Sequence, residues 1–167
     1  MDGKEGGVSE ENRFSLEDKL RFSELYLKKA ESILREFDDL YEKGFFLNLC
    51  NRAYYVVFNM SKSLLILSGR DPQTEREVKY LLYVALPHEK EMHRLLRDLE
   101  HYRSIADYDL VMDDDISPEE ALEVKEKAKM YVEIAKGIRE SLVRSLAGEE
   151  INKKPHRRSN YPRPPER

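Results

Sequence analysis

Residues 45–69 have the sequence FFLNLCNRAYYVVFNMSKSLLILSG. Its apolar side chains occupy nearly every side of a helical wheel, and only a polar line through Arg52, Asn59 and Lys62 interrupts them. A helix with so little polar surface is usually buried by several neighbours. The stretch therefore predicts the central helix of an all-α bundle.

The same stretch is long enough to be considered as a membrane span, because about 20 apolar residues cross a bilayer. Arg52 and Lys62, together with three asparagines, make insertion into lipid costly. No other uncharged apolar run approaches the required length. We therefore expect a protein without a membrane partner.

The amino-acid composition also favours a helical protein without a membrane partner. The chain has 167 residues, which is the size of one domain, with 40% hydrophobic residues, 37% charged residues and no tryptophan. This mixture favours amphipathic helices and excludes a collagen, a mucin and most β-sandwiches. The N-terminus lacks a signal-peptide core, and a single cysteine, Cys50, forbids an internal disulfide. A cytoplasmic location is the resulting expectation.

Helical patterns flank the central stretch on both sides. Ser15 is placed to cap an apolar stripe that runs from Phe22 to Leu40, and Gly44 ends it. The clearest helix start is Ser117-Pro118-Glu119-Glu120, which combines an N-cap, a proline at the first helical position and a capping-box glutamate. The apolar residues after it step by three and four: Ala121, Val124, Ala128, Tyr131, Ala135, Ile138 and Leu142.

Two further helices are expected between these. Residues 71–86 favour a short helix, although VKYLLYVAL has strand propensity, and a regular stripe follows Pro87 up to Ala106. The sequence therefore predicts an up-and-down bundle of four to five helices over residues 15–148. We expect a flexible N-terminal arm at residues 1–14 and a basic, proline-rich tail at residues 149–167.

Charge is distributed unevenly. Residues 152–167 hold six Lys and Arg and one Glu, whereas the preceding residues hold 23 basic and 32 acidic side chains. An acidic body argues against the broad basic face that non-specific duplex binding needs. Any contact with RNA is therefore expected to be local, or to be made by the tail.

Two motifs resemble a known family. The run NRAYYVVF at residues 51–58 is followed by KSLL at residues 62–65, and YRSIADYD stands about fifty residues later at 102–109. This combination resembles the HEPN superfamily, and more narrowly its small stand-alone UPF0332-like proteins, over residues 18–142. The resemblance implies a compact helical bundle, frequently a homodimer, in which polar positions of the two motif helices face a shared cleft.

The resemblance also implies two kinds of function. Many HEPN proteins pair with a small nucleotidyltransferase in a toxin–antitoxin operon, and many are metal-independent ribonucleases with an arginine, four to six spacer residues and a histidine. Here Arg103 fills the arginine position, but Tyr108 stands where the histidine is expected. A phenol with an ordinary pKa near ~10 is a poor general base at neutral pH. We therefore favour a module that binds RNA, a nucleotide or a partner protein, with a ribonuclease toxin using Arg103 and Tyr108 as the alternative.

The expected site combines both motif helices, without a metal or a cofactor. His93 and His101 lie two helical turns apart, roughly 12 Å, which is too far for one ion. Purely structural roles for these residues remain as alternatives. Arg52 is then a structural ion-pair partner, Arg103 and Asp107 form a surface ion pair, and the aromatic residues belong to the core. The residues expected at the cleft are Arg52, Tyr55, Asn59, Arg103, Asp107 and Tyr108.

Overall fold

The computed structural model describes residues 14–153, and within this range every regular element is a helix. The all-α prediction is therefore confirmed. The elements in chain order are α1 (Leu16–Leu34), α2 (Phe37–Glu42), α3 (Phe46–Leu67), α4 (Glu75–Ala85), α5 (Lys90–Ala106), the 3-10 turn η2 (Asp113–Asp115) and α6 (Pro118–Lys153).

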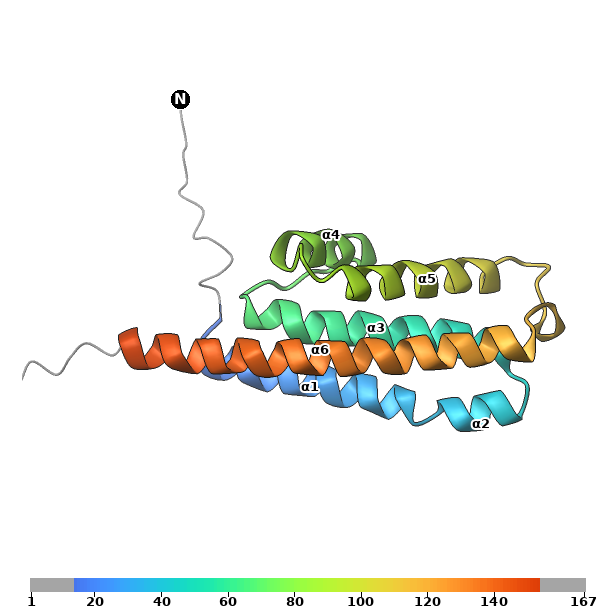
Figure 1. The fold of residues 1–167 in the computed structure, drawn as a ribbon, viewed down its shortest axis with the longest axis horizontal. Coiled ribbons are helices and arrows are strands. Elements are labelled where there is room, and N and C mark those ends of the chain that lie inside the picture. Colours follow the sequence, from blue (N-terminus) through green and yellow to red (C-terminus); the bar gives the residue numbers. More distant parts are fainter. Residues whose placement is uncertain (1–13, 154–167) are drawn as a thin grey trace, which may run out of the picture.

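The long helices run alongside one another and alternate in direction, as Figure 1 shows for α1, α3, α5 and α6. Helix α3 lies among them and packs against α1, α2, α4, α5 and α6. Most of its side chains are buried, from Leu49 near its start to Leu67 at its end. Residues 45–69, whose apolar side chains lie on nearly every side, thus contain the central helix of the bundle, as predicted. Among the described residues, no helix is long and apolar enough to cross a membrane.

The prediction of a single helix between Ser15 and Gly44 is wrong, because this segment forms two helices. The Ser15 hydroxyl does cap its start, accepting a hydrogen bond from the Asp18 amide at 3.1 Å. Helix α1 nevertheless ends at Leu34, and α2 begins at Phe37 after a short turn. The break buries the Phe37 ring to 1% exposure and directs Glu36 toward α3.

The short helix expected within residues 71–86 is confirmed as α4. Its N-cap is Thr74, whose hydroxyl accepts a hydrogen bond from the Glu77 amide at 3.1 Å. Pro87 does not start the next helix, since α5 begins at Lys90. His93 is buried, and its Nε2 lies 2.7 Å from the Leu86 carbonyl oxygen.

Helix α6 begins with the predicted capping box. The Ser117 hydroxyl accepts from the Glu120 amide at 3.0 Å, and the Glu120 carboxylate accepts from the Ser117 amide at 3.3 Å. The helix continues to Lys153, beyond the boundary expected at Gly148. Residues 1–13 of the expected arm and residues 154–167 of the expected tail lie outside the described residues.

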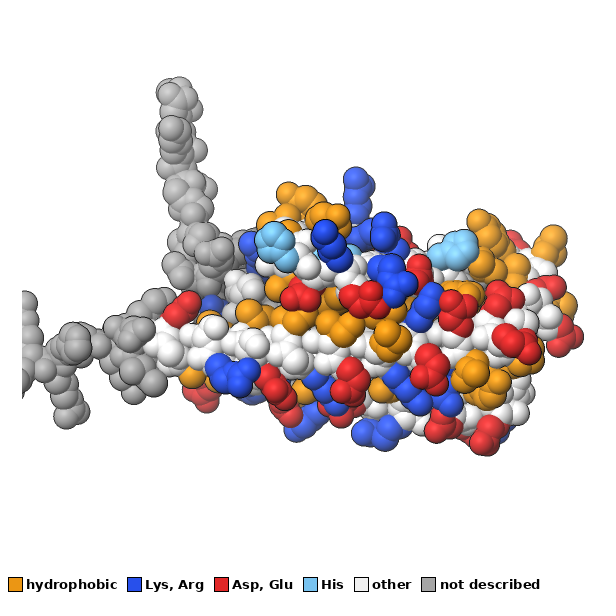
Figure 2. Space-filling model, viewed as in Figure 1, with side chains coloured by type: hydrophobic (Ala, Val, Ile, Leu, Met, Phe, Trp, Pro, Cys, Tyr) orange, Lys and Arg blue, Asp and Glu red, His pale blue; other side chains and the backbone are white. Residues whose placement is uncertain are grey.

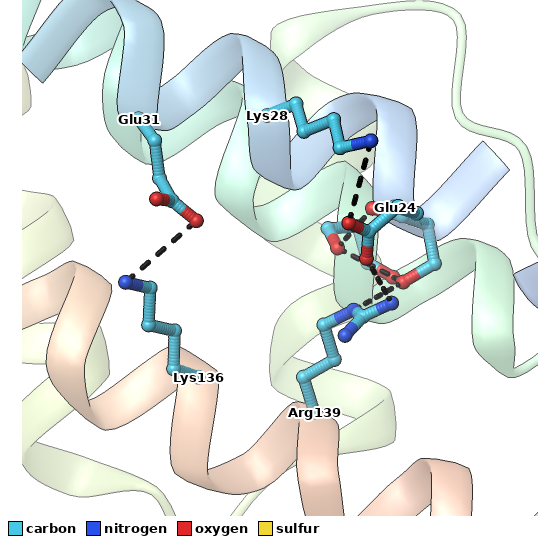
Figure 3. Close-up of polar contacts among 7 residues, drawn as sticks. Glu24, Lys28, Glu31, Lys136 and Arg139 are labelled. Carbon is cyan, nitrogen blue, oxygen red and sulfur yellow. Dashed lines mark hydrogen bonds and ion pairs between the residues drawn. The ribbon is translucent and has the colours of Figure 1, made fainter. Parts of the chain in front are cut away.

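Polar side chains link α1, α3 and α6 inside the bundle (Figure 3). Ser23 and Ser63 are fully buried, and each hydroxyl donates a hydrogen bond to the other residue's carbonyl oxygen, at 2.8 and 2.7 Å. Arg139 donates from Nε to the Ser23 hydroxyl at 2.9 Å and from Nη2 to Glu24 at 3.2 Å. The three helices are therefore held in one register by satisfied polar groups rather than by apolar packing alone.

Candidate functional site

A cleft of about 390 Å³ opens between α4 and α5, with Tyr54 of α3 contributing to its wall. Helix α4 supplies Glu75, Arg76 and Lys79, and α5 with its C-cap supplies the remaining side chains, which are Glu100, Arg103, Ser104 and Asp107. Three basic and three acidic side chains therefore line it. Its volume is within the range of about 300–1,000 Å³ that is typical of small-molecule sites.

Arg103 is the most enclosed cation of the cleft, with a side chain that is 22% exposed. Its Nη1 lies 2.5 Å from Glu75 Oε1, and its Nε lies 3.6 Å from Asp107 Oδ2. Burial alone would lower the pKa of Arg103, but the hydrogen bond and charge of Glu75 outweigh this effect and raise the pKa. The guanidinium is therefore a permanent positive charge in the cleft.

Tyr54 provides an aromatic surface beneath that charge. The Arg103 guanidinium carbon lies 4.3 Å from the centroid of the Tyr54 ring, within the range of a cation–π contact. Burial, reinforced by the charges of Glu75 and Glu100, raises the pKa of Tyr54 to about 12. The phenol stays protonated at neutral pH, so Tyr54 serves as a platform and not as a base.

The other two cations of the cleft lie on α4. Lys79 forms an ion pair with Glu100 Oε2 at 3.1 Å, which bridges the two walls. Arg76 is exposed and has no ion pair among residues 14–149. On the face shown in Figure 2, Lys and Arg side chains gather over α4 and α5. The lining of the cleft itself is balanced, with three cations against three carboxylates.

The structure brings three of the expected site residues together. Arg103 and Asp107 both line the cleft. The Tyr55 ring, 41% exposed, has its centroid 5.7 Å from the Arg103 guanidinium carbon. These three residues come from both motif helices, so the two motifs do meet at this place.

The other three expected residues lie elsewhere. Arg52 forms two hydrogen bonds with the Glu36 carboxylate, at 2.8 and 3.0 Å, and does not line the cleft. This is the structural ion pair that was its alternative role. Asn59 is 5% exposed and donates to the Tyr55 carbonyl oxygen at 2.7 Å. Tyr108 is 67% exposed beyond the end of α5 and is not a lining residue.

Several lining residues were absent from the sequence-based site, chiefly those of α4. Glu75 and Lys79 are four residues apart, as are Glu100 and Ser104, so each pair shares one face of its helix. Thr74, followed three residues later by Glu77, marks the start of α4 and places Glu75 in its first turn. The sequence therefore indicates where α4 begins, but it does not show which helix packs against the face that carries Glu75 and Lys79.

The arrangement suits binding of an anion with an aromatic group better than proton transfer. A guanidinium on an aromatic face is suited to a phosphate, and the neighbouring rings are suited to a base. No histidine lines the cleft, and the expected partner of Arg103, Tyr108, lies outside it. Among the described residues, no group of three His, Cys, Asp or Glu side chains is arranged to hold a metal ion.

Comparison with known proteins agrees with this architecture. The model of the HEPN domain matches residues 23–146, which include α3, α4, α5 and every lining residue of the cleft. A UPF0332 protein of Archaeoglobus fulgidus is 27% identical over 117 residues, covering 68% of this chain and 91% of that protein. The chain therefore belongs to the HEPN domain family, as a UPF0332-like member.

Proposed function

We propose that this protein is a nucleotide- or RNA-binding module whose ligand enters the cleft between α4 and α5. The observation that carries the proposal is the Arg103 guanidinium lying 4.3 Å above the Tyr54 ring, inside a cleft of about 390 Å³. Membership of the HEPN domain family supports a nucleotide- or RNA-related role.

A phosphate group would bind between the cations of the two walls. Arg103 offers a planar set of donors that matches phosphate oxygens, while Lys79 and Arg76 add positive charge from α4. A base of the ligand would lie against Tyr55, whose ring is exposed at 41% next to Arg103. Stacking of this kind accepts any base, because each base has an aromatic face.

The geometry supports binding better than cleavage of RNA with Arg103 and Tyr108. Cleavage through the 2′-hydroxyl needs a general base beside the phosphate that the arginine holds. Tyr108 is 67% exposed and does not line the cleft, so it does not lie beside a phosphate held by Arg103 there. The family's frequent arginine–histidine arrangement has no counterpart among the lining residues.

The proposal includes protein partners. We infer from the resemblance that the chain forms a homodimer and works with a small nucleotidyltransferase in a cytoplasmic toxin–antitoxin pair. Phe45, which is 45% exposed at the start of α3, offers an apolar surface that a partner can cover. Light scattering of the purified protein tests the dimer, and co-purification with the product of the neighbouring gene tests the pairing.

Binding is tested by calorimetric titration with adenosine monophosphate and with a short single-stranded RNA. Loss of one charge-assisted contact in Arg103→Ala should weaken binding by about tenfold. The matched control is Arg97→Ala, which removes an exposed arginine of α5 outside the cleft. The proposal fails if neither ligand binds the wild-type protein at millimolar concentration, or if the two variants behave alike. Arg103-dependent cleavage of RNA in EDTA would instead establish the ribonuclease alternative.

A further inference from the structure

A row of aromatic rings and cations continues from the cleft along α3 to α1. The Lys62 ammonium lies 4.9 Å from the Tyr26 ring centroid and 5.6 Å from that of Phe58. The Phe58 and Tyr54 rings are stacked, with centroids 6.5 Å apart and planes inclined by 27°. We call this set the α3 row, and its members are Tyr26, Tyr54, Tyr55, Phe58, Lys62 and Arg103.

The row lies along one side of α3. Tyr55, Phe58 and Lys62 are separated by three and four residues, so they share one helical face, and each is at least partly exposed. The positions between them, such as Val56, Val57 and Met60, are buried. Tyr26 of α1 and Arg103 of α5 reach this face from either side. The row therefore joins side chains of three helices, and Tyr54, which links Phe58 to Arg103, is buried with 5% exposure.

Lys62 holds an unneutralised positive charge in this row. It forms no ion pair among residues 14–149, and its described contacts are the two aromatic rings. An ammonium group has three hydrogen-bond donors, which ring faces do not satisfy as an anion does. The lysine is therefore placed to receive an anionic group that crosses the α3 face.

The two cations of the row lie over different rings. Lys62 contacts Tyr26 and Phe58, whereas Arg103 contacts Tyr54 and Tyr55. Residues 54 and 62 are about 12 Å apart along the axis of α3. A mononucleotide offers a single phosphate and a single base, so it occupies only the Arg103 end. A strand with successive phosphates and bases can reach both cations while its bases stack on the rings between them.

We propose that the α3 row is a track for single-stranded RNA, which leads from the Arg103 cleft to a second phosphate site at Lys62. This inference rests on the proposed function and names its ligand as a strand of two or more nucleotides. Tyr55 and Phe58 stack on the bases, and Lys62 binds a phosphate beyond the cleft. Paired bases cannot lie on these rings, so duplex RNA is not the ligand.

The test compares hexa-adenylate RNA with adenosine monophosphate on the full chain, by fluorescence anisotropy and calorimetry. Lys62→Gln should weaken hexamer binding by about fivefold, reduce the slope of log affinity against log salt by about one, and leave monophosphate binding unchanged. Lys62→Arg should restore hexamer binding. The control Lys29→Gln removes an exposed lysine of α1 outside the row and should change neither affinity.

A second variant guards against a folding defect at Lys62. Phe58→Leu removes a partly exposed ring of the row that does not line the cleft, and it should also weaken the hexamer selectively, by about fivefold or more. The inference is overturned if both variants bind the hexamer as the wild type does, or if the hexamer binds no more tightly than the monophosphate. If Arg103→Ala does not affect the monophosphate, the proposed function itself has failed. If only the Lys62 and Phe58 effects are missing, the track alone has failed.

Discussion

The Glu75 carboxylate already pairs with Arg103, which is the cation that the proposed ligand needs. Removal of the Glu75 charge should therefore strengthen ligand binding. Its Oε1 lies 2.5 Å from Arg103 Nη1, in the first turn of α4. A phosphate must displace this carboxylate or share the guanidinium with it. Glu75→Gln keeps the shape of the side chain but removes its charge, which frees Arg103 except for the longer contact of 3.6 Å to Asp107.

The magnitude follows from the exposure of the pair. The Glu75 side chain is 45% exposed and that of Arg103 is 22% exposed, so solvent screens part of their attraction. Pairs of this kind contribute up to about 1 kcal/mol. Because about 1.4 kcal/mol corresponds to a tenfold change in affinity, Glu75→Gln should tighten phosphate binding by about fivefold. The same change should lower the free energy of unfolding by at most about 1 kcal/mol.

Binding and stability should therefore change in opposite directions, which separates this effect from simple damage to the fold. Calorimetric titration with adenosine monophosphate measures the affinity, and urea denaturation measures the stability. Glu126→Gln, an exposed glutamate of α6 far from the lining residues in sequence and absent from the cleft, is the control and should change neither. An affinity that stays the same or falls in Glu75→Gln would show that Glu75 does not compete with the phosphate for Arg103.

Three further variants or reactions test the fold. Tyr131→Phe removes the buried contact of 2.5 Å between Tyr131 Oη and Ser61 Oγ and should lower the free energy of unfolding by about 1 kcal/mol in urea; an unchanged midpoint would contradict this. Ser117→Ala removes the cap of α6 and should also lower the free energy of unfolding by about 1 kcal/mol, which a lower melting temperature would show. The control Ser145→Ala, at an exposed position of the same helix, should leave the melting temperature unchanged. Burial raises the pKa of Cys50 to about 12, so this thiol is unreactive in the folded protein. A thiol reagent at pH 8 should therefore label Cys50 in urea but not in the folded protein. Rapid labelling of the folded protein would show that the core is open.

The bundle could be predicted from the sequence wherever a signal is local. The apolar stretch at 45–69 and the capping box at Ser117 each specify an element without reference to the others, and both elements form as expected. The break before Phe37 could not be predicted, because residues 35 and 36 are neither proline nor glycine. It arises from tertiary contacts, namely the burial of Phe37 and the pairing of Glu36 with Arg52.

The site was harder to predict because periodicity shows which residues share a helix face but not what that face meets. Arg52 and Tyr55 are three residues apart on α3, yet Arg52 reaches the turn between α1 and α2, and Tyr55 reaches Arg103. The role of Glu75 depends on where α4 packs, which nothing within its own eleven residues determines. Arg103 and Asp107 were identified because a family motif, rather than periodicity, marked them.

Helix α4 is attached to the rest of the bundle more loosely than its neighbours. It packs chiefly against α3, and its buried side chains are Val78 and Leu82. Its links to α5 include the ion pairs Glu75–Arg103 and Lys79–Glu100 and the contact between the Tyr83 and His93 rings. Local unfolding of such a segment needs little free energy, so the amide hydrogens of α4 should exchange with deuterium before those of α3 or α6. Local opening of α4 would widen one wall of the cleft and would expose Val78 and Leu82 of the core to solvent.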